Sequence, residues 1–328
     1  MKLIHSSAEI YDEKDPFKKI EKIGRTCYKS EDKITDDSCF KFVDTLIKHK
    51  HFAMLEHAWF NFVVTNSTNN NYIDIPYMLG SIPFSKWTEL YHNEWLISLS
   101  FSHLNQTYGD DKINTFIAVL KRLVASRYIN KSEQLYAYLN AGDYEIEIQL
   151  VENLIDFLNN TKIKTSPQLY NFANTVDKHT FLTFKFICDR GVSHELVRHR
   201  ASFAQESTRY CNYSKDKYGN ELTFIYPNNY EEWDVDSKRI FEFDLYNVEM
   251  LYMELIKLNK TPQQARAILP NALKTEVFMT YNLIGWDHFF DMRSIGTTGA
   301  PHPDMKELAD EALLKYRTLL KSKGITKY

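Results

Sequence analysis

Residues 189–213 carry a dense group of cationic side chains, which constrains how the chain can fold around them. The segment reads DRGVSHELVRHRASFAQESTRYCNY. Asp189, Glu195 and Glu206 are its only carboxylates, so the cluster needs further anions for neutralisation. We predict a site for an anionic ligand here, although an exposed helix face balanced by carboxylates elsewhere explains the pattern about equally well. The cationic residues are Arg190, His194, Arg198, His199, Arg200 and Arg209.

The rest of the composition makes this cluster a local feature. The chain has 328 residues, a formal net charge of −3 and 44% hydrophobic residues. General nucleic-acid binders are usually basic overall, so we expect no nucleic-acid partner. No apolar run approaches the length of a membrane span, and the N-terminal residues lack the apolar core of a signal peptide. We therefore expect a globular protein with no membrane contact.

Cysteine usage indicates a reducing compartment. The four cysteines are scattered and form no CxxC pair. We expect a cytoplasmic location, or the host cytoplasm if the source is viral.

Glycine usage excludes the two commonest glycine-based ways of holding a nucleotide's phosphates. The chain has 10 glycines, and no two of them are separated by a single residue. Neither GxGxxG nor GxxxxGK[ST] is therefore present. Any bound nucleotide must be held mainly by side chains.

Hydrophobic periodicity predicts a mixed α/β chain. Strands are expected at residues 58–65, 181–188 and 222–226. The first helix should be capped by Asp36 or Ser38, and the third should start at Thr261 with a capping box. Helices are expected at residues 36–50, 239–257, 261–270, about 272–293, and from about 303 onward.

The long stretch between the first two predicted strands contains no chemical motif. It opens with the loop-like run NSTNNNYID and contains helix-like pieces at residues 112–128 and 145–160. We predict a mostly helical insertion at about residues 67–180, within a single domain that spans residues 1–328.

Two features of the C-terminal third allow both a functional and a structural interpretation. Asn282, Trp286, Phe289 and Arg293 share one face of a predicted helix, which could cradle an aromatic ring or simply form a core stripe with polar ends. Arg266 lies among apolar neighbours in QQARAIL and could bind a ligand or make a surface ion pair. The pattern alone favours the structural interpretation for both.

A group of histidines near residue 50 does not predict a metal site. His49, His51, Glu56 and His57 match no tight zinc spacing, and no second pair of ligands follows them. We expect no metal in this protein.

The arginine segment resembles the signature of the flavin-dependent thymidylate synthases, the ThyX family. Arg198-His199-Arg200 is followed by Ser207-Thr208-Arg209-Tyr210, with one residue fewer between the two parts than is usual. The resemblance covers about residues 1–66 and 181–320. Further segments resemble the family in the same order, namely RTCYKS at 25–30, KHKHFAMLEH at 48–57, ARAILP at 265–270, residues 282–293 and PHPDMKELA at 301–309.

This resemblance implies a fold and an activity. The fold would be α/β (α+β), with a central antiparallel sheet flanked by helices and interrupted by the insertion. The activity would be that of a methyltransferase that converts dUMP to dTMP, with methylenetetrahydrofolate as one-carbon donor and NADPH-reduced FAD as hydride carrier. The assembly would be a homotetramer with shared active sites. The alternative is a non-catalytic or altered-specificity member that binds a nucleotide or a flavin.

The resemblance also implies roles for individual residues. Arg293 would be catalytic, because its positive charge at the uracil edge favours the ionised base. Ser207 would bind rather than attack, since no base and orienting acid suggest a triad. The residues implied to bind dUMP are Glu195, Arg198, Gln205, Glu206, Ser207, Thr208, Arg209, Arg266 and Arg293. Those implied to hold FAD are Cys27, Ala53, Arg198, His199, Arg200, Gln205, Asn282 and His288.

Overall fold

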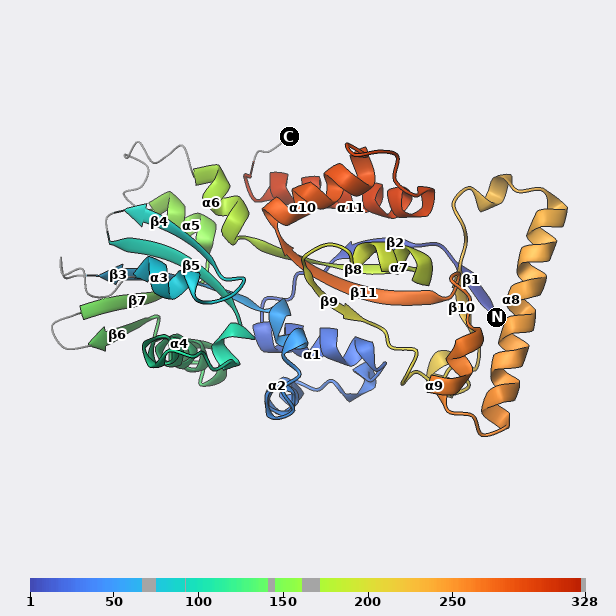
Figure 1. The fold of residues 1–328 in the computed structure, drawn as a ribbon, viewed down its shortest axis with the longest axis horizontal. Coiled ribbons are helices and arrows are strands. Elements are labelled where there is room, and N and C mark those ends of the chain that lie inside the picture. The colour runs from blue at the N-terminus through green and yellow to red at the C-terminus, as the bar shows by residue number, and fades with distance from the viewer. Residues whose placement is uncertain (67–74, 92, 141–144, 161–171, 326–328) are drawn as a thin grey trace.

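A four-stranded antiparallel sheet, which we call the main sheet, forms the centre of the molecule (Figure 1). The computed structural model describes residues 1–66, 75–91, 93–140, 145–160 and 172–325. The strand order is β2-β8-β11-β9, and a short parallel pair, β1 with β10, lies beside it. The bounds are β1 Lys2–Ile4, β2 Ser7–Ile10, β8 Phe181–Asp189, β9 Ser202–Gln205, β10 Thr223–Ile225 and β11 Lys274–Asn282. The predicted mixed fold with a central antiparallel sheet is confirmed.

The two central strands, β8 and β11, are covered on both faces. Because side chains alternate along β8, Leu182, Phe184 and Phe186 all point into the same apolar core. The opposite face carries Thr183, which shares a 2.7 Å hydrogen bond with Thr280 of β11. The strand predicted at residues 181–188 is confirmed.

Helices cover the main sheet on both sides (Figure 1). One face packs against α7, α10 and α11, whose side chains share a core with β8 and β11. The other face packs against α1 and the 3-10 helix η2, and α2 lies against α1. The bounds are α1 Pro16–Cys27, α2 Ser38–Lys48, η2 Phe52–His57, α7 Arg190–Leu196, α10 Leu283–Phe290 and α11 Pro303–Ser322.

The insertion forms most of a second sheet, which its prediction as mostly helical did not include. This five-stranded antiparallel sheet has the order β4-β5-β3-β7-β6, and only β3 lies outside residues 67–180. Its strands are β3 Trp59–Asn66, β4 Lys86–Tyr91, β5 Glu94–Ser100, β6 Tyr136–Asn140 and β7 Glu145–Val151. Its helices are α3 Ile75–Gly80, α4 Asp111–Val124, α5 Leu154–Asn160 and α6 Phe172–His179.

The two helix-like pieces of the insertion had different outcomes. Residues 112–128 form α4 and its π-helical end, as predicted. Residues 145–160 are half strand and half helix, because the alternating run EIEI has the period of a strand. The predicted loop at NSTNNNYID lies almost entirely outside the described residues, as do residues 141–144 and 161–171.

The helix predicted at about residues 272–293 is wrong in its first half. Residues 274–282 are the strand β11, and only then does α10 begin. Val277 and Met279 enter one core while Phe278 enters another, so apolar residues occur on both faces of the strand. A strand that is buried on both sides loses the alternation that would distinguish it from a helix.

The other predicted elements are confirmed, with one wrong cap. The strands at residues 58–65 and 222–226 correspond to β3 and β10, and the last helix to α11. The helix predicted at 239–257 is α8, Val235–Lys257, and Thr261 begins α9, Pro262–Ala265, with a capping box. Asp37 holds the N-cap position of α2 and makes no side-chain cap bond, so neither Asp36 nor Ser38 caps it. Within the described part of the chain, no helix is both long and apolar enough to cross a membrane.

Candidate active site

Four residues from two distant segments, Glu195, His199, His288 and Arg293, form what we call the Arg293 cluster. Arg293 lies in the π-helical turn Asp291–Ile295 that follows α10. Its Nη1 donates to Glu195 Oε2 at 2.6 Å and its Nε donates to His199 Nε2 at 3.2 Å. Its Nη2 also donates to the backbone oxygen of Glu195 at 3.4 Å. These three contacts fix the plane of the guanidinium group and leave two of its five N–H groups for a ligand.

The imidazole of His199 is neutral in this environment. The pKa of His199 is lowered to about 4, chiefly by burial, with the neighbouring Arg293 and His288 acting in the same direction. Because Nε2 accepts from Arg293, the ring proton belongs on Nδ1. The ring also packs edge-on against Phe289, with 5.1 Å between ring centroids. His199 is therefore held as an acceptor that orients Arg293.

Residues 206–210, which we call the Ser207 segment, leave the end of β9 and pass close to the end of α1. The Ser207 amide donates to the backbone oxygen of Cys27 at 2.9 Å. Two exposed rings lie side by side here, Tyr28 and Tyr210, with centroids 5.2 Å apart. The predicted substrate segment and a predicted flavin-contacting residue are thus neighbours.

Arg209 is the exposed cation of this segment. Its Nε donates to Gln263 of α9 at 2.8 Å, and its guanidinium lies 5.3 Å from the centre of the Tyr210 ring. No carboxylate of the described residues pairs with it within 4 Å, so its charge is balanced by solvent. An exposed guanidinium beside aromatic faces suits a flat, anionic ligand.

Two of the residues predicted to bind dUMP point into the protein interior. Glu206 is 2% exposed at its side chain, where it accepts from Lys274 at 2.9 Å and from the Tyr213 hydroxyl at 3.1 Å. Thr208 is also buried. The Glu206 carboxylate is therefore turned away from the surface that Arg209 presents, and the roles of Glu206 and Thr208 toward dUMP remain predictions.

Gln205 and Asn282 make structural contacts within the chain. Gln205 Nε2 donates to Ser193 of α7 at 2.9 Å and to Thr275 of β11 at 3.2 Å. The Asn282 side chain caps α10 by accepting from the Gly285 amide at 3.0 Å, and it donates to the Lys178 backbone oxygen at 3.0 Å. Both amides hold elements around the candidate site, while their roles toward dUMP and FAD remain predictions.

The remaining predicted residues are mostly accessible. Cys27 is buried at the end of α1, and burial raises the pKa of its thiol to about 12, so it is not a thiolate nucleophile. Ala53 lies on η2, which packs against β9. Solvent-exposed positions are Ala53, Arg198, Arg200, Arg266 and His288.

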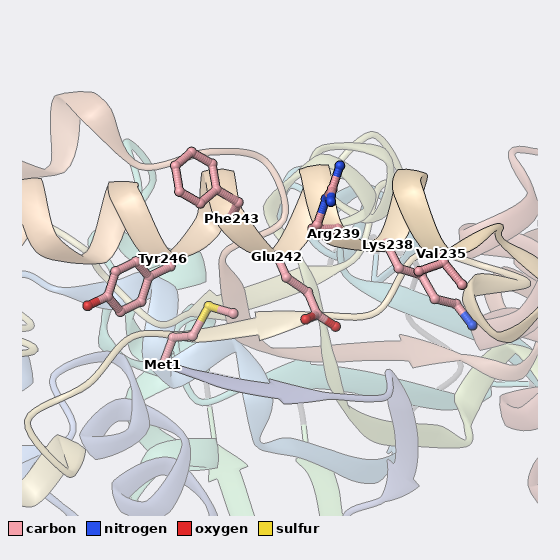
Figure 2. Close-up of a pocket in the computed structure, with 7 residues that line it drawn as sticks. All are labelled: Met1, Val235, Lys238, Arg239, Glu242, Phe243 and Tyr246. Atoms are coloured by element: carbon pink, nitrogen blue, oxygen red, sulfur yellow. The ribbon is translucent and has the colours of Figure 1, made fainter.

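Two cavities in the described part of the chain are lined by none of the arginines predicted to bind dUMP or FAD. A cavity of about 310 Å³ beside α7 is lined by Glu195 together with Asp189 and Asp304, and these carboxylates repel a phosphate. A second, open cavity of about 610 Å³ runs along α8 and is lined by Phe243, Tyr246 and others that were not predicted as site residues (Figure 2).

The histidines near residue 50 diverge in the fold. His57 is fully buried, bonds Thr280 at 2.7 Å, and has a pKa lowered to about 3, chiefly by burial. His49 and His51 are exposed. Among the described residues, no group of three or more His, Cys, Asp or Glu side chains is placed to hold a metal ion.

Sequence reasoning missed three charged residues beside the Ser207 segment: Lys29, Lys274 and Glu276. They form a network with Glu206 and Lys185. A signal was present, because Lys274 and Glu276 stand two residues apart and share a face if the segment is a strand. The wrong helix prediction for residues 272–293 hid it.

Comparison with protein families decides the relationship of this chain. A model of the family described as Thymidylate synthase complementing protein matches residues 9–69 and 169–320. The chain belongs to this family. The unmatched residues between the two ranges nearly coincide with the insertion predicted from the sequence.

Individual members of the family match a smaller part of this chain than the family model does. The chain is 34% identical over 140 residues to a flavin-dependent thymidylate synthase of Pyrococcus furiosus, a match that covers 40% of this chain and 53% of that protein. It is 31% identical over 121 residues to one of Geobacter sulfurreducens, covering 36% and 50%. The chain thus spans about half the length of the curated relatives it matches.

Among solved structures, a UMP/dUMP methylase PolB from Streptomyces cacaoi bound with 5-Br dUMP aligns with 97% of this chain and 93% of its own. The sequence identity is 12% and the TM-score is 0.40, a likeness too weak to support any conclusion about this chain.

Proposed function

We propose that this chain is an enzyme that reductively methylates dUMP to dTMP, and that it acts in the cytoplasm. Membership of the thymidylate synthase complementing family supports the reaction, and four free, buried cysteines are in keeping with the compartment. The observation that carries the proposal is the Arg293 cluster. It joins the RHR motif to the C-terminal motif at residue 293, 98 residues from Glu195.

In this proposal, Arg293 acts on the pyrimidine ring. A guanidinium group held by Glu195 and His199 places positive charge at the uracil edge, where negative charge develops when the base becomes nucleophilic. Because its plane is fixed before the ligand arrives, the group needs no reorganisation during the reaction. Arg198, Arg209 and Arg266, which are exposed, would bind the phosphate and sugar.

The residues implied to hold FAD fit an anionic, flat cofactor. Exposed Arg198 and Arg200 flank His199, which suits a pyrophosphate. Cys27 and Ala53 lie on the two elements that pack against β9, where a small side chain leaves room for a ring. FAD, when bound, would supply hydride for the new methyl group, with NADPH and methylenetetrahydrofolate as the proposed co-substrates.

We also propose a homotetramer with shared active sites. The helix α8 is 23 residues long, yet only Leu245 and Tyr252 on it are buried. The side chains of Phe243 and Tyr246 extend from α8 (Figure 2), and both line the open cavity along it. An exposed apolar stripe of this kind is typical of a surface that binds another protein. We propose that the α8 helix of a second copy of this chain packs against it. The stripe comprises Val235, Ile240, Phe243, Tyr246, Met250, Leu251 and, at the C-cap, Leu258.

The association is tested by Phe243→Glu, with molar mass measured by light scattering after gel filtration. Phe243 is 64% exposed, so the variant should fold and yet form smaller assemblies. An unchanged mass for this variant and for Ile240→Glu would overturn α8 as the interface.

The activity is tested with the purified protein. We expect flavin absorbance bands and NADPH oxidation that depends on both dUMP and methylenetetrahydrofolate. A protein that carries flavin but is inert in this assay would leave the alternative, a family member that binds a nucleotide or flavin without turnover. The absence of both flavin and nucleotide binding would overturn the function altogether.

A further inference from the structure

A network of five charged side chains lies beneath the Ser207 segment. Lys274 bonds both Glu206 and Glu276, with 2.9 Å between Nζ and Glu206 Oε2. Lys185 donates to Glu276 at 2.8 Å. Lys29 pairs with Glu276 and lies 3.6 Å from Glu206 Oε2. Each carboxylate therefore contacts at least two lysines.

The two carboxylates of this network depend on their partners. The side chains of Glu206 and Glu276 are 2% and 9% exposed, and that of Lys274 is 15% exposed. A carboxylate this deeply buried stays ionised only when cations and donors surround it. Burial by itself raises the pKa of Glu276, but the neighbouring lysines hold it far below its usual range. Burial lowers the pKa of Lys274, but the two carboxylates more than offset this effect and raise it to about 12.

The network joins three segments that are distant in sequence. Glu206 begins the Ser207 segment, and its amide donates to the Glu276 backbone oxygen at 2.9 Å. Lys29 follows the end of α1 by two residues and has a left-handed backbone with φ of 48°. The Ser207 amide bonds the Cys27 backbone oxygen at 2.9 Å. The ion pairs therefore clamp the start of the Ser207 segment to β11 and to the end of α1.

The first residue of the Ser207 segment is held by the network, while its last residues are exposed to solvent. Glu206 points inward into the network, whereas Arg209 is exposed three residues later. Since Ser207 is adjacent to Glu206 and Arg209 follows two residues after Ser207, the positions of both depend on where Glu206 is held. A carboxylate that never meets the ligand can in this way set the geometry of the residues that do.

We propose that Glu206 and Lys274 are positioning residues that hold the Ser207 segment in its nucleotide-binding geometry. This inference rests on the proposed function, because the nucleotide is the dUMP proposed there. It replaces a direct contact of Glu206 with dUMP by an indirect role. Positioning of a binding segment acts equally on the ground state and the transition state, so it should change KM for dUMP and leave kcat almost unchanged.

The main test is Lys274→Met, which keeps length and removes charge. We expect KM and the dissociation constant for dUMP, measured by calorimetry, to rise about tenfold while kcat changes less than about twofold. Lys274→Arg should restore most of the affinity. The matched control is Lys315→Met, because Lys315 also pairs with a carboxylate, Glu311 at 2.6 Å, but on α11. This control should leave dUMP affinity unchanged.

A second readout does not depend on activity. Hydrogen exchange followed by mass spectrometry should show at least about tenfold faster exchange of the Ser207 amide in Lys274→Met than in the wild type or Lys315→Met. If Lys274→Met fails to fold, Glu206→Gln serves instead, since the amide keeps the shape and the Tyr213 contact. We expect the same direction of change in both measurements.

Unchanged exchange at Ser207 together with dUMP affinity within about twofold of wild type would overturn the positioning role. Equal losses of kcat and kcat/KM would also contradict it, because they indicate an interaction made only in the transition state. Failure of the proposed function shows differently: the wild type itself would not bind dUMP, while the exchange experiment would still decide whether the network orders the segment.

Discussion

The Arg293 cluster and the Ser207 segment present arginine in two different states. The Arg293 side chain is 16% exposed and makes three contacts, one of them an ion pair with Glu195. Arg209 is exposed, and it contacts the neutral amide of Gln263 and the ring of Tyr210. A ligand at Arg293 must share the cation with a carboxylate, whereas a ligand at Arg209 displaces only water.

This difference gives the two arginines different roles: Arg293 is held in a fixed orientation, and Arg209 is free to bind an anion. A guanidinium already held by protein acceptors has a fixed direction but a largely neutralised charge, which suits a role in stabilising one particular charge distribution. An exposed guanidinium keeps its charge for a phosphate but has little fixed geometry. Arg293 should therefore govern the rate of the reaction and Arg209 the binding of the nucleotide.

The largest expected effect comes from Arg293→Ala. We expect kcat to fall by about a thousandfold, the upper range for loss of one oriented electrostatic contact, with flavin content unchanged. Steady-state kinetics and the flavin absorbance of the purified variant test this. Arg127→Ala is the matched control, because Arg127 also pairs with a carboxylate, Glu152, but lies in the insertion. An unchanged rate for Arg293→Ala would remove the distinction between the two regions.

The next effect should come from Arg209→Ala. Loss of a charged hydrogen bond to phosphate should raise KM for dUMP by about thirtyfold, while kcat stays within about twofold. The exposed Arg122 of α4 provides the control Arg122→Ala, which should change neither constant. A fall in kcat without a change in KM would mean that Arg209 acts on the reaction as Arg293 is expected to, and the proposed difference between the two regions would be wrong.

A smaller effect is expected from Glu195→Gln. The amide can still accept from Arg293 but no longer carries charge, so the guanidinium is held less firmly. We expect kcat to fall by about five- to tenfold, with KM for dUMP changed less than threefold. Glu152→Gln is the control from the insertion pair. Full activity of Glu195→Gln would mean that hydrogen bonding alone orients Arg293.

The smallest expected effect is the contribution of His199 to the pH dependence of stability. Its pKa is about 4 in the folded protein, below the usual value near 6.5, so the unfolded chain binds more protons between these values. Stability should therefore fall as the pH drops from 6.5 toward 4, and part of this loss should vanish in His199→Asn. The difference in melting temperature between the wild type and His199→Asn should change by about 2 °C between pH 6.5 and pH 4.

Thermal unfolding at several pH values, compared between wild type and variant, tests the His199 prediction. Buried His57 and His179 also have lowered pKa values, near 3, but they are present in both proteins and cancel in the comparison. A constant difference between the two melting temperatures across this range would show that His199 is not held neutral in the folded protein.

Much of this protein could be predicted from local sequence. The RHR and Ser-Thr-Arg-Tyr motifs identified the candidate substrate segment. Periodicity identified α8, α11 and β8, because the spacing of apolar residues in amphipathic helices and strands follows the face that is buried. The absence of glycine-rich phosphate motifs also predicted that any bound nucleotide is held mainly by side chains.

Pairings across the fold could not be predicted in the same way. The ion pair of Arg293 with Glu195 spans 98 residues, and that of Lys274 with Glu206 spans 68. No local pattern encodes which distant strand a residue will face. The family resemblance implied that Glu206 contacts the ligand, whereas its partner Lys274 on β11 holds its side chain in the interior.

The sequence by itself determined which residues carry charge and which segments present them, since these follow from composition and from the period of each element. Only the tertiary structure decided which charges are neutralised inside the chain and which stay open. Burial makes that difference, because a carboxylate removed from water must find a cation wherever the fold brings one near.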